Sequence, residues 1–203
     1  MSFTEFFSIM KDIFLAGAAT ITAYVALKGL EKWKDELSGK ANFEVARDFI
    51  RTVYKLRDEI HYCRSPFISA AEFPEGYNGA LGGITNEEKG DAYFYVYKTR
   101  WQPVSEAVQN FDTAVLEAEA LWGKEVKEAG EKLRNLVIRL RFSLDTFIQN
   151  EYSRNQDFTD RELDAKIRAD VNRSRSERDT LSPAIDEVIK EIEELVRPHL
   201  KRN

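Results

Sequence analysis

The sequence is poor in the residues that build crosslinks and metal sites. It has one cysteine, Cys63, and two histidines, His61 and His199. A lone thiol cannot form an internal disulfide, so the fold does not require an oxidising compartment. The histidines lie far apart in the sequence, and no ligand spacing typical of zinc is present. We therefore predict that the protein uses no metal and no other cofactor.

An excess of positive charge is also missing. The net charge is −5 at pH 7, and the isoelectric point is near 5.3. General nucleic-acid binders concentrate lysine and arginine, because those side chains contact the phosphates. We therefore predict no nucleic-acid partner.

Strand-like alternation of apolar and polar residues is nearly absent, and apolar residues instead recur at spacings of three and four. This spacing is typical of amphipathic helices. It extends over residues 41–64, 86–122, 124–152 and 182–197. The predicted fold class is all-α, with a single N-terminal membrane helix (residues 1–37, including a juxtamembrane segment) followed by a four- or five-helix bundle (residues 38–203). Ser38-Gly39 is the predicted stop or bend between the two parts.

Local signals predict where several helices begin and end. Ser65-Pro66 should end the helix that begins near residue 41, because proline cannot continue the hydrogen-bond ladder. Thr85 and Glu88 form a capping box that opens the next helix, and Pro103 should kink or split that helix before it ends at Gly123.

The C-terminal third carries similar signals. Thr159 and Glu162 repeat the capping-box pattern, which predicts a very polar helix from about residue 159 to Arg178. Ser182 is the predicted N-cap of the last helix, with Pro183 in its first turn.

The N-terminal apolar segment determines the predicted location. Residues 13–27 carry no charge, but they cover only about 22 Å of the roughly 30 Å hydrocarbon core of a bilayer. A membrane anchor is favoured, because the flanking Lys11 and Lys28 can extend toward headgroups. A soluble core helix and a cleaved signal peptide stay open, although Glu5 and Asp12 make the signal peptide's first region unfavourable. The residues assigned to the membrane are Ile13, Phe14, Leu15, Ile21, Tyr24, Val25, Leu27 and Trp33.

The charges around this segment predict its orientation. Lys28, Lys32, Lys34 and Lys40 follow it, whereas Lys11 is the only basic residue before it. Because positive residues favour the cytoplasmic side, the N-terminus should lie outside and the bundle in the cytoplasm, as in a single-pass inner-membrane protein. Ala16, Ala19, Ala23 and Ala26 share one side of the helix, and small residues let membrane helices approach closely. A homo-oligomer through this helix is therefore a candidate assembly, although alanine is common in short spans.

A long irregular segment is predicted at about residues 66–85, with two prolines and four glycines. Such loops are often binding elements or lids, although their apolar residues can also pack back onto the domain. Arg173, Arg175 and Arg178 form a basic cluster that could contact an anionic partner, while a solvated charged helix is the simpler interpretation. The candidate partner-binding residues are Phe67, Phe73, Tyr77, Leu81, Arg173, Arg175 and Arg178.

No catalytic constellation is present. His61 and Cys63 are two residues apart on a predicted helix and therefore do not face each other, so they form no nucleophile and base pair. Arg134, Arg139 and Arg141 cluster near the middle of a predicted helix; one of them could pair with an acidic face opposite, and a role in stability is favoured over a functional one. We predict that the protein is not an enzyme.

Motifs in the first half of the chain resemble those of uncharacterised bacterial proteins with a short membrane helix and a helical body. The stretch GLEKWKDELSGK corresponds to a GLxxWKxxLxGK-like junction, and RTVYKLRDEI to an RxVYKLRDxI-like helix. The C-terminal ELVRPHL is also similar. This resemblance implies a membrane-anchored topology and no particular activity.

These patterns favour a membrane-tethered helical interaction or adaptor protein with an unknown protein partner. A more specific version is a component of a bacterial stress or phage-defence system. The alternative is a soluble helical ligand-binding protein whose N-terminal helix is part of the core.

Overall fold

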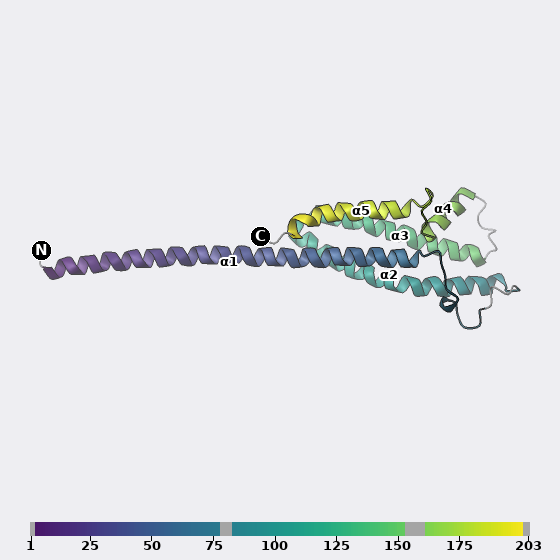
Figure 1. Cartoon of the computed structure of the whole chain (residues 1–203), viewed down its shortest axis with the longest axis horizontal. Helices are drawn as coiled ribbons and strands as arrows, with labels where there is room; N and C mark the ends of the chain where they lie inside the picture. The colour runs from purple at the N-terminus through teal and green to yellow at the C-terminus, as the bar shows by residue number, and fades with distance from the viewer. Residues whose placement is uncertain (1–2, 78–82, 153–160, 201–203) are drawn as a thin grey trace.

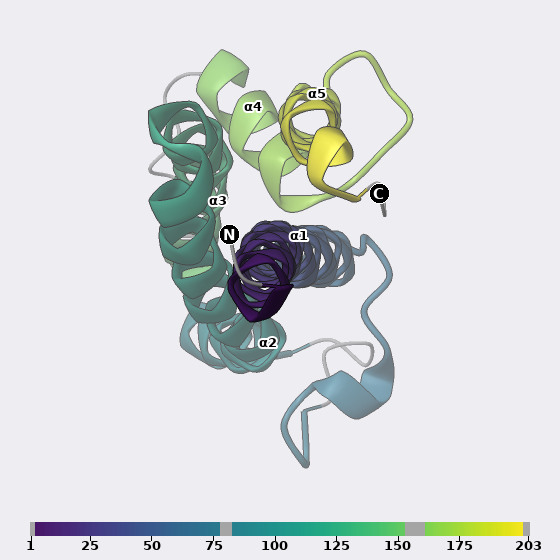
Figure 2. The same ribbon diagram turned by 90° about the vertical axis from the view of Figure 1, so that its left-hand side faces the viewer.

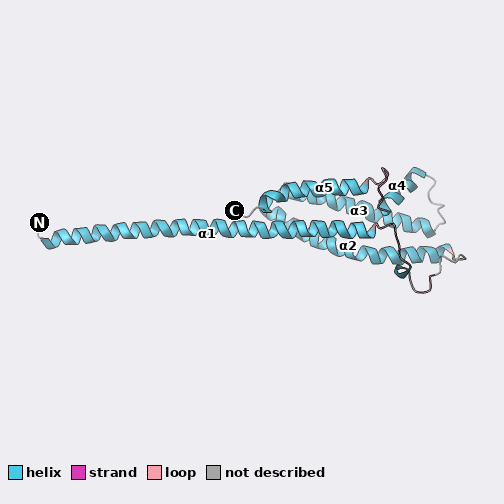
Figure 3. Ribbon diagram, viewed as in Figure 1, coloured by secondary structure: helices cyan, strands magenta, loops and turns pink. Residues whose placement is uncertain are grey.

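The computed structural model describes residues 3–77, 83–152 and 161–200, apart from the side chains at 4–7, 9, 12 and 13 (Figure 1). Every regular element in these ranges is a helix, as Figure 3 shows, and this confirms the all-α prediction. The α-helices are α1 (Phe3–Cys63), α2 (Asn86–Trp122), α3 (Lys124–Tyr152), α4 (Arg161–Val171) and α5 (Leu181–Val196). Two short 3-10 helices, η1 (Ala70–Glu72) and η3 (Arg197–Leu200), complete the described elements.

The second half of α1 packs with α2, α3 and α5 in an antiparallel four-helix arrangement. Phe49 of α1 stacks on Phe111 of α2, with 6.0 Å between ring centroids. The Tyr54 hydroxyl of α1 donates a hydrogen bond to Glu193 of α5 at 2.8 Å. The shorter α4 packs against α3 at the far end of the bundle, and Figure 2 shows these helices around α1.

The core consists of the apolar stripes that the sequence predicts. The α1 stripe comprises Ala46, Phe49, Val53, Leu56, Ile60 and Cys63, all fully buried. Facing stripes come from α2, α3 and α5, and they include Val104, Ala107, Phe111, Leu133, Leu140, Leu144, Ile185, Ile189 and Ile192. Burial of these side chains is the main contribution to the stability of the bundle.

The predicted stop or bend at Ser38-Gly39 is wrong. Both residues lie inside α1, which continues for 24 more residues to Cys63. Glycine within a helix costs only about 1 kcal/mol relative to alanine, and the packed turns that follow offset this cost. The helix does end just before Ser65-Pro66, as predicted.

Of the two outcomes predicted for Pro103, a kink or a split, the split is wrong, because α2 runs from Asn86 to Trp122 with the proline inside it. Burial of Val104 and Ala107 stabilises the turns after the proline. The capping box of Thr85 and Glu88 is confirmed, since each side chain accepts from the other's backbone N–H. Gly123 ends α2 with a φ of 84°, a conformation that favours glycine.

Two predicted boundaries in the C-terminal third change. α4 ends at Val171, not near Arg178, and Thr159 of the predicted capping box lies outside the described residues. α5 begins at Leu181, so Ser182 is not its N-cap. Asp179 takes the capping role instead, since its carboxylate accepts from the Ser182 backbone N–H at 3.1 Å.

Candidate interaction surface

The first part of α1 projects from the bundle as an isolated helix, the N-terminal arm (residues 3–41; Figure 1). At 1.5 Å per residue the arm is about 58 Å long. All side chains from residue 14 to residue 41 are exposed. The large apolar ones, Phe14, Leu15, Ile21, Tyr24, Val25, Leu27, Leu30, Trp33 and Leu37, are 54 to 79% exposed.

The bundle begins where the arm ends, at Asn42. The Trp122 indole donates a hydrogen bond to the Asn42 side chain at 2.9 Å. The ring of His199 of η3 stacks on the same indole, with 4.3 Å between the ring centroids. These contacts close the base of the bundle, and none of the helices that the structure describes continues alongside the arm.

The apolar residues assigned to the membrane thus lie on a free surface, with the side chain of Ile13 outside the description. None of the helices described here combines enough length with enough apolar character to cross a bilayer. The predicted membrane-spanning helix therefore gains no support from the structure. The middle of the apolar segment is alanine, glycine and threonine, which contribute far less hydrophobicity than leucine or isoleucine.

The arm also does not complete the core, as the alternative interpretation required. Ala16, Ala19, Ala23 and Ala26 are exposed, and the buried core of α1 starts at Ala46. An isolated helix is only marginally stable in water, because most helical stability comes from packing one face. The arm therefore presents an apolar surface that no described part of the chain covers.

The polar groups of the apolar segment bond within their own helix. The Thr20 hydroxyl donates to the Ala16 carbonyl at 2.8 Å, and Thr22 donates to Ala18 at 2.9 Å. Lys28 lies over the Tyr24 ring, with its nitrogen 5.4 Å from the centroid. Because both threonine hydroxyls are hydrogen-bonded within the helix, neither needs water as a partner. Lys28 is the first charged residue after this stretch, so an apolar environment could extend to about residue 28.

The loop between α1 and α2 packs back onto the bundle over much of its described length. Arg100 of α2, 2% exposed, donates to the backbone carbonyls of Ser65 and Phe67 and to the Glu72 carboxylate. Phe73 stacks on Tyr77 and contacts Tyr93 of α2 edge-on. Of the candidate partner-binding residues here, Phe73 and Tyr77 therefore pack internally, Phe67 is exposed, and Leu81 lies outside the described residues.

The other candidate residues, Arg173, Arg175 and Arg178, lie on the linker between α4 and α5 and not on a helix. All three are exposed. The Arg173 backbone N–H donates to the Arg64 carbonyl at 2.8 Å, which fixes the linker against the end of α1. The structure therefore holds this basic linker in place without burying its side chains.

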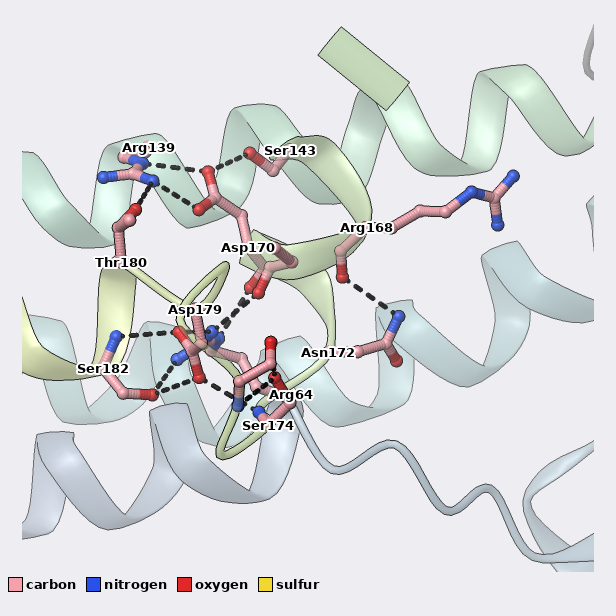
Figure 4. Close-up of polar contacts among 12 residues, drawn as sticks. Arg64, Arg139, Ser143, Arg168, Asp170, Asn172, Ser174, Asp179, Thr180 and Ser182 are labelled. Atoms are coloured by element: carbon pink, nitrogen blue, oxygen red, sulfur yellow. Dashed lines mark hydrogen bonds and ion pairs between the residues drawn. The ribbon is translucent and has the colours of Figure 1, made fainter. Parts of the chain in front are cut away.

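A buried ion network holds the same linker (Figure 4). Arg64 is 0% exposed and donates to Asp179, to the Ser182 hydroxyl and to the carbonyls of Ala169 and Asp170. The carboxylate of Asp170 in turn accepts from Arg139 and from the Ser143 hydroxyl. Every member is hydrogen-bonded, so the network fixes the relative positions of α1, α3, α4 and α5.

The network also sets the charge of Asp179. Burial alone would raise the pKa of this carboxyl, but hydrogen bonds from Arg64, Ser174 and Ser182 lower it from 3.8 to about 2. Nothing in the local sequence distinguishes Arg64 from the exposed arginines of α1, so its burial could not be predicted. All three arginines of the predicted cluster form ion pairs: Arg134 with Asp112 of α2, Arg139 with Asp170 of α4, and Arg141 with Asp145 of its own helix.

The residues that could carry nucleophilic chemistry are not arranged for it. Cys63 is buried, and this burial raises the pKa of its thiol to about 12, so the thiolate is not available at neutral pH. Burial and the positive charge of Arg173 lower the pKa of His61. Within the described ranges, no group of three or more His, Cys, Asp or Glu residues could hold a metal ion.

A groove of about 530 Å³ lies between α1 and α2. Its walls carry Asp48, Arg51 and Lys55 of α1 and Glu117 of α2, with small residues between them. Because both signs of charge are represented, the groove selects for neither an anion nor a cation.

Comparisons with known proteins give no family. No protein-family model, no curated protein and no solved structure matches this chain.

Proposed function

We propose that the protein is a membrane-tethered helical interaction module, in which the N-terminal arm holds the bundle at a bilayer. The observation that carries this proposal is the exposed apolar surface of the arm, which no described part of the chain covers. Exposed apolar patches of this extent are typical of surfaces that meet lipid or another protein.

The distribution of charge along the arm supports lipid for its outer part. Residues 13–27 carry no charge, and their apolar side chains point in all directions around the helix, as lipid would require. Four lysines follow on the bundle side, which favours a cytoplasmic bundle at the inner membrane. The segment is short, so Lys11 and Lys28 would have to extend toward the headgroups.

The bundle would supply the interaction surface. Phe67 and the linker arginines Arg173, Arg175 and Arg178 are its exposed candidates. The segments that carry them, the loop after α1 and the linker between α4 and α5, lie at the end of the bundle far from the arm (Figure 1). A role in bacterial stress or phage defence is the more specific form of this proposal. It predicts that any toxicity of overexpression disappears when residues 1–30 are removed.

Ultracentrifugation of lysed cells without detergent tests the tether. The untagged protein should sediment with membranes, whereas the double variant Leu15→Glu, Val25→Glu should stay in the supernatant, because charge in the hydrocarbon is costly. The matched control, Leu116→Glu with Ile138→Glu, charges two equally exposed positions on the bundle and should still sediment. Wild-type protein in the supernatant would contradict the tether.

A further inference from the structure

One side of the arm carries an apolar seam that begins inside the uncharged segment 13–27 and continues beyond it toward the bundle. Seven residues, Ala16, Ala19, Ala23, Ala26, Leu30, Trp33 and Leu37, recur at alternating intervals of three and four. This is the a and d pattern of a coiled coil, which places one narrow stripe against a facing helix. We define these seven residues as the seam.

Charged residues avoid the seam. Lys28, Glu31, Lys32, Lys34, Asp35 and Glu36 all fall at other positions, and only Lys34 and Glu36 flank it. Continuing the spacing in either direction reaches a charged residue, Asp12 or Lys40, so the seam has two defined ends. Beyond residue 27, therefore, the arm is a polar helix with one apolar stripe and not a lipid-facing cylinder.

The seam is uncovered within the described chain. Leu30, Trp33 and Leu37 are 60, 61 and 54% exposed. The bundle cannot reach them, because its base closes at Asn42 against Trp122. A facing helix must therefore come from another molecule, and it must match four small residues followed by three large ones over about 32 Å.

We propose that a second copy of α1 covers the seam in a parallel, in-register pair, an inference that rests on the proposed tether. Two copies inserted in one membrane by the same end run in the same direction. Each alanine then faces its own counterpart, which allows close approach, and Trp33 faces Trp33 where the larger residues widen the pair. In this register, flanking positions of like charge do not face each other, because Lys34 lies across from Gly29 and Glu36 from Ala41.

The seam is too small to hold two copies together in dilute solution, so the pair depends on the membrane tether. A strip about 32 Å long and about 10 Å wide amounts to roughly 300 Å² per copy, less than half of the approximately 800 Å² per partner in a stable interface. The pair should therefore dissociate in dilute solution and form where the membrane raises the effective concentration.

Disulfide crosslinking of the full chain in isolated membranes tests the pair. Leu30→Cys and Leu37→Cys place a thiol in the seam, whereas Lys28→Cys and Asp35→Cys place it on the opposite side. The native Cys63 is buried, so the wild type should give no crosslink. We expect mild oxidation to convert most of the seam variants to dimers, with the outward variants at wild-type background. Dilution in detergent should lower the seam yield by about tenfold or more.

A charge in the seam provides the second test. Leu37→Glu should abolish the crosslink at position 30, and the matched outward change Lys32→Glu should leave it intact. Equal crosslinking at seam and outward positions, or none in protein that sediments with membranes, would overturn the pair and leave the tether standing. Crosslinking confined to the seam in protein that stays in the supernatant would support the pair and contradict the tether.

Discussion

The two halves of α1 belong to one uninterrupted helix, yet they have different surroundings. Residues 42–63 bury Ala46, Phe49 and Val53 in the bundle, while the side chains of residues 14–41 are exposed. Both halves carry apolar residues at intervals of three and four. The two stripes are out of register, however, because nine residues separate Leu37 from Ala46 where seven would continue the pattern. The same helix thus presents one apolar face to its own bundle, while the apolar face of residues 14–41 stays exposed.

The largest expected difference between the halves comes from removing a positive charge. Arg64→Ala should destabilise the bundle by about 3 to 5 kcal/mol, because it leaves Asp179 buried without its ion pair. Lys34→Ala in the arm should change the unfolding free energy by less than about 0.5 kcal/mol, because the side chain is exposed. Denaturant unfolding of both variants measures this contrast. Equal effects would show that the two halves unfold as a single unit.

Glycine substitutions should change stability in opposite directions in the bundle and in the arm. A Cβ at Gly130 would lie 2.9 Å from a methyl group of Val115, so Gly130→Ala should cost about 1 to 3 kcal/mol. Gly29 has open space around it. Gly29→Ala should therefore stabilise the arm helix by up to about 1 kcal/mol and leave the unfolding temperature of the bundle unchanged. Circular dichroism during thermal unfolding resolves both. A stabilising Gly130→Ala would contradict the close packing of α2 on α3.

Acid should affect the bundle through Asp179. Its pKa is lowered on folding from 3.8 to about 2, so the carboxylate stabilises the fold above about pH 4. That contribution, about 2 kcal/mol, is lost as the pH falls from about 4 toward 2. The difference in unfolding free energy between wild type and Asp179→Asn should therefore shrink over this interval. If this difference in unfolding free energy does not change with pH, the negative charge of Asp179 is not what stabilises the fold.

Much of the bundle could be predicted from sequence, because its signals are local. The capping box at Thr85, the helix end at Gly123 and the stripe from Ala46 to Cys63 each depend on residues a few positions apart. The break predicted at Ser38-Gly39 was wrong, because a glycine inside a long helix costs too little to end it. A helix can change its exposed face without bending when different partners cover its two ends.

The buried network was beyond sequence reasoning for a different reason. Arg64, Asp170 and Asp179 are charged, and charged side chains in proteins are usually exposed to water. Only the long-range pairing of α1 with the α4–α5 linker makes them internal. The packing of Phe73 and Tyr77 against α2 was one of two interpretations left open, since the choice depends on contacts with Tyr93, 20 and 16 residues further along the chain.

Hydrogen exchange along α1 in the full-length protein tests most directly whether its packed half and its exposed half differ in local stability. Without membranes, amides of residues 46–63 should exchange slowly and those of residues 14–40 rapidly, because only the former half is packed. Adding lipid vesicles should protect residues 14–27 and leave the bundle unchanged. Slow exchange along the whole helix without vesicles, or an arm that vesicles do not protect, would contradict this account.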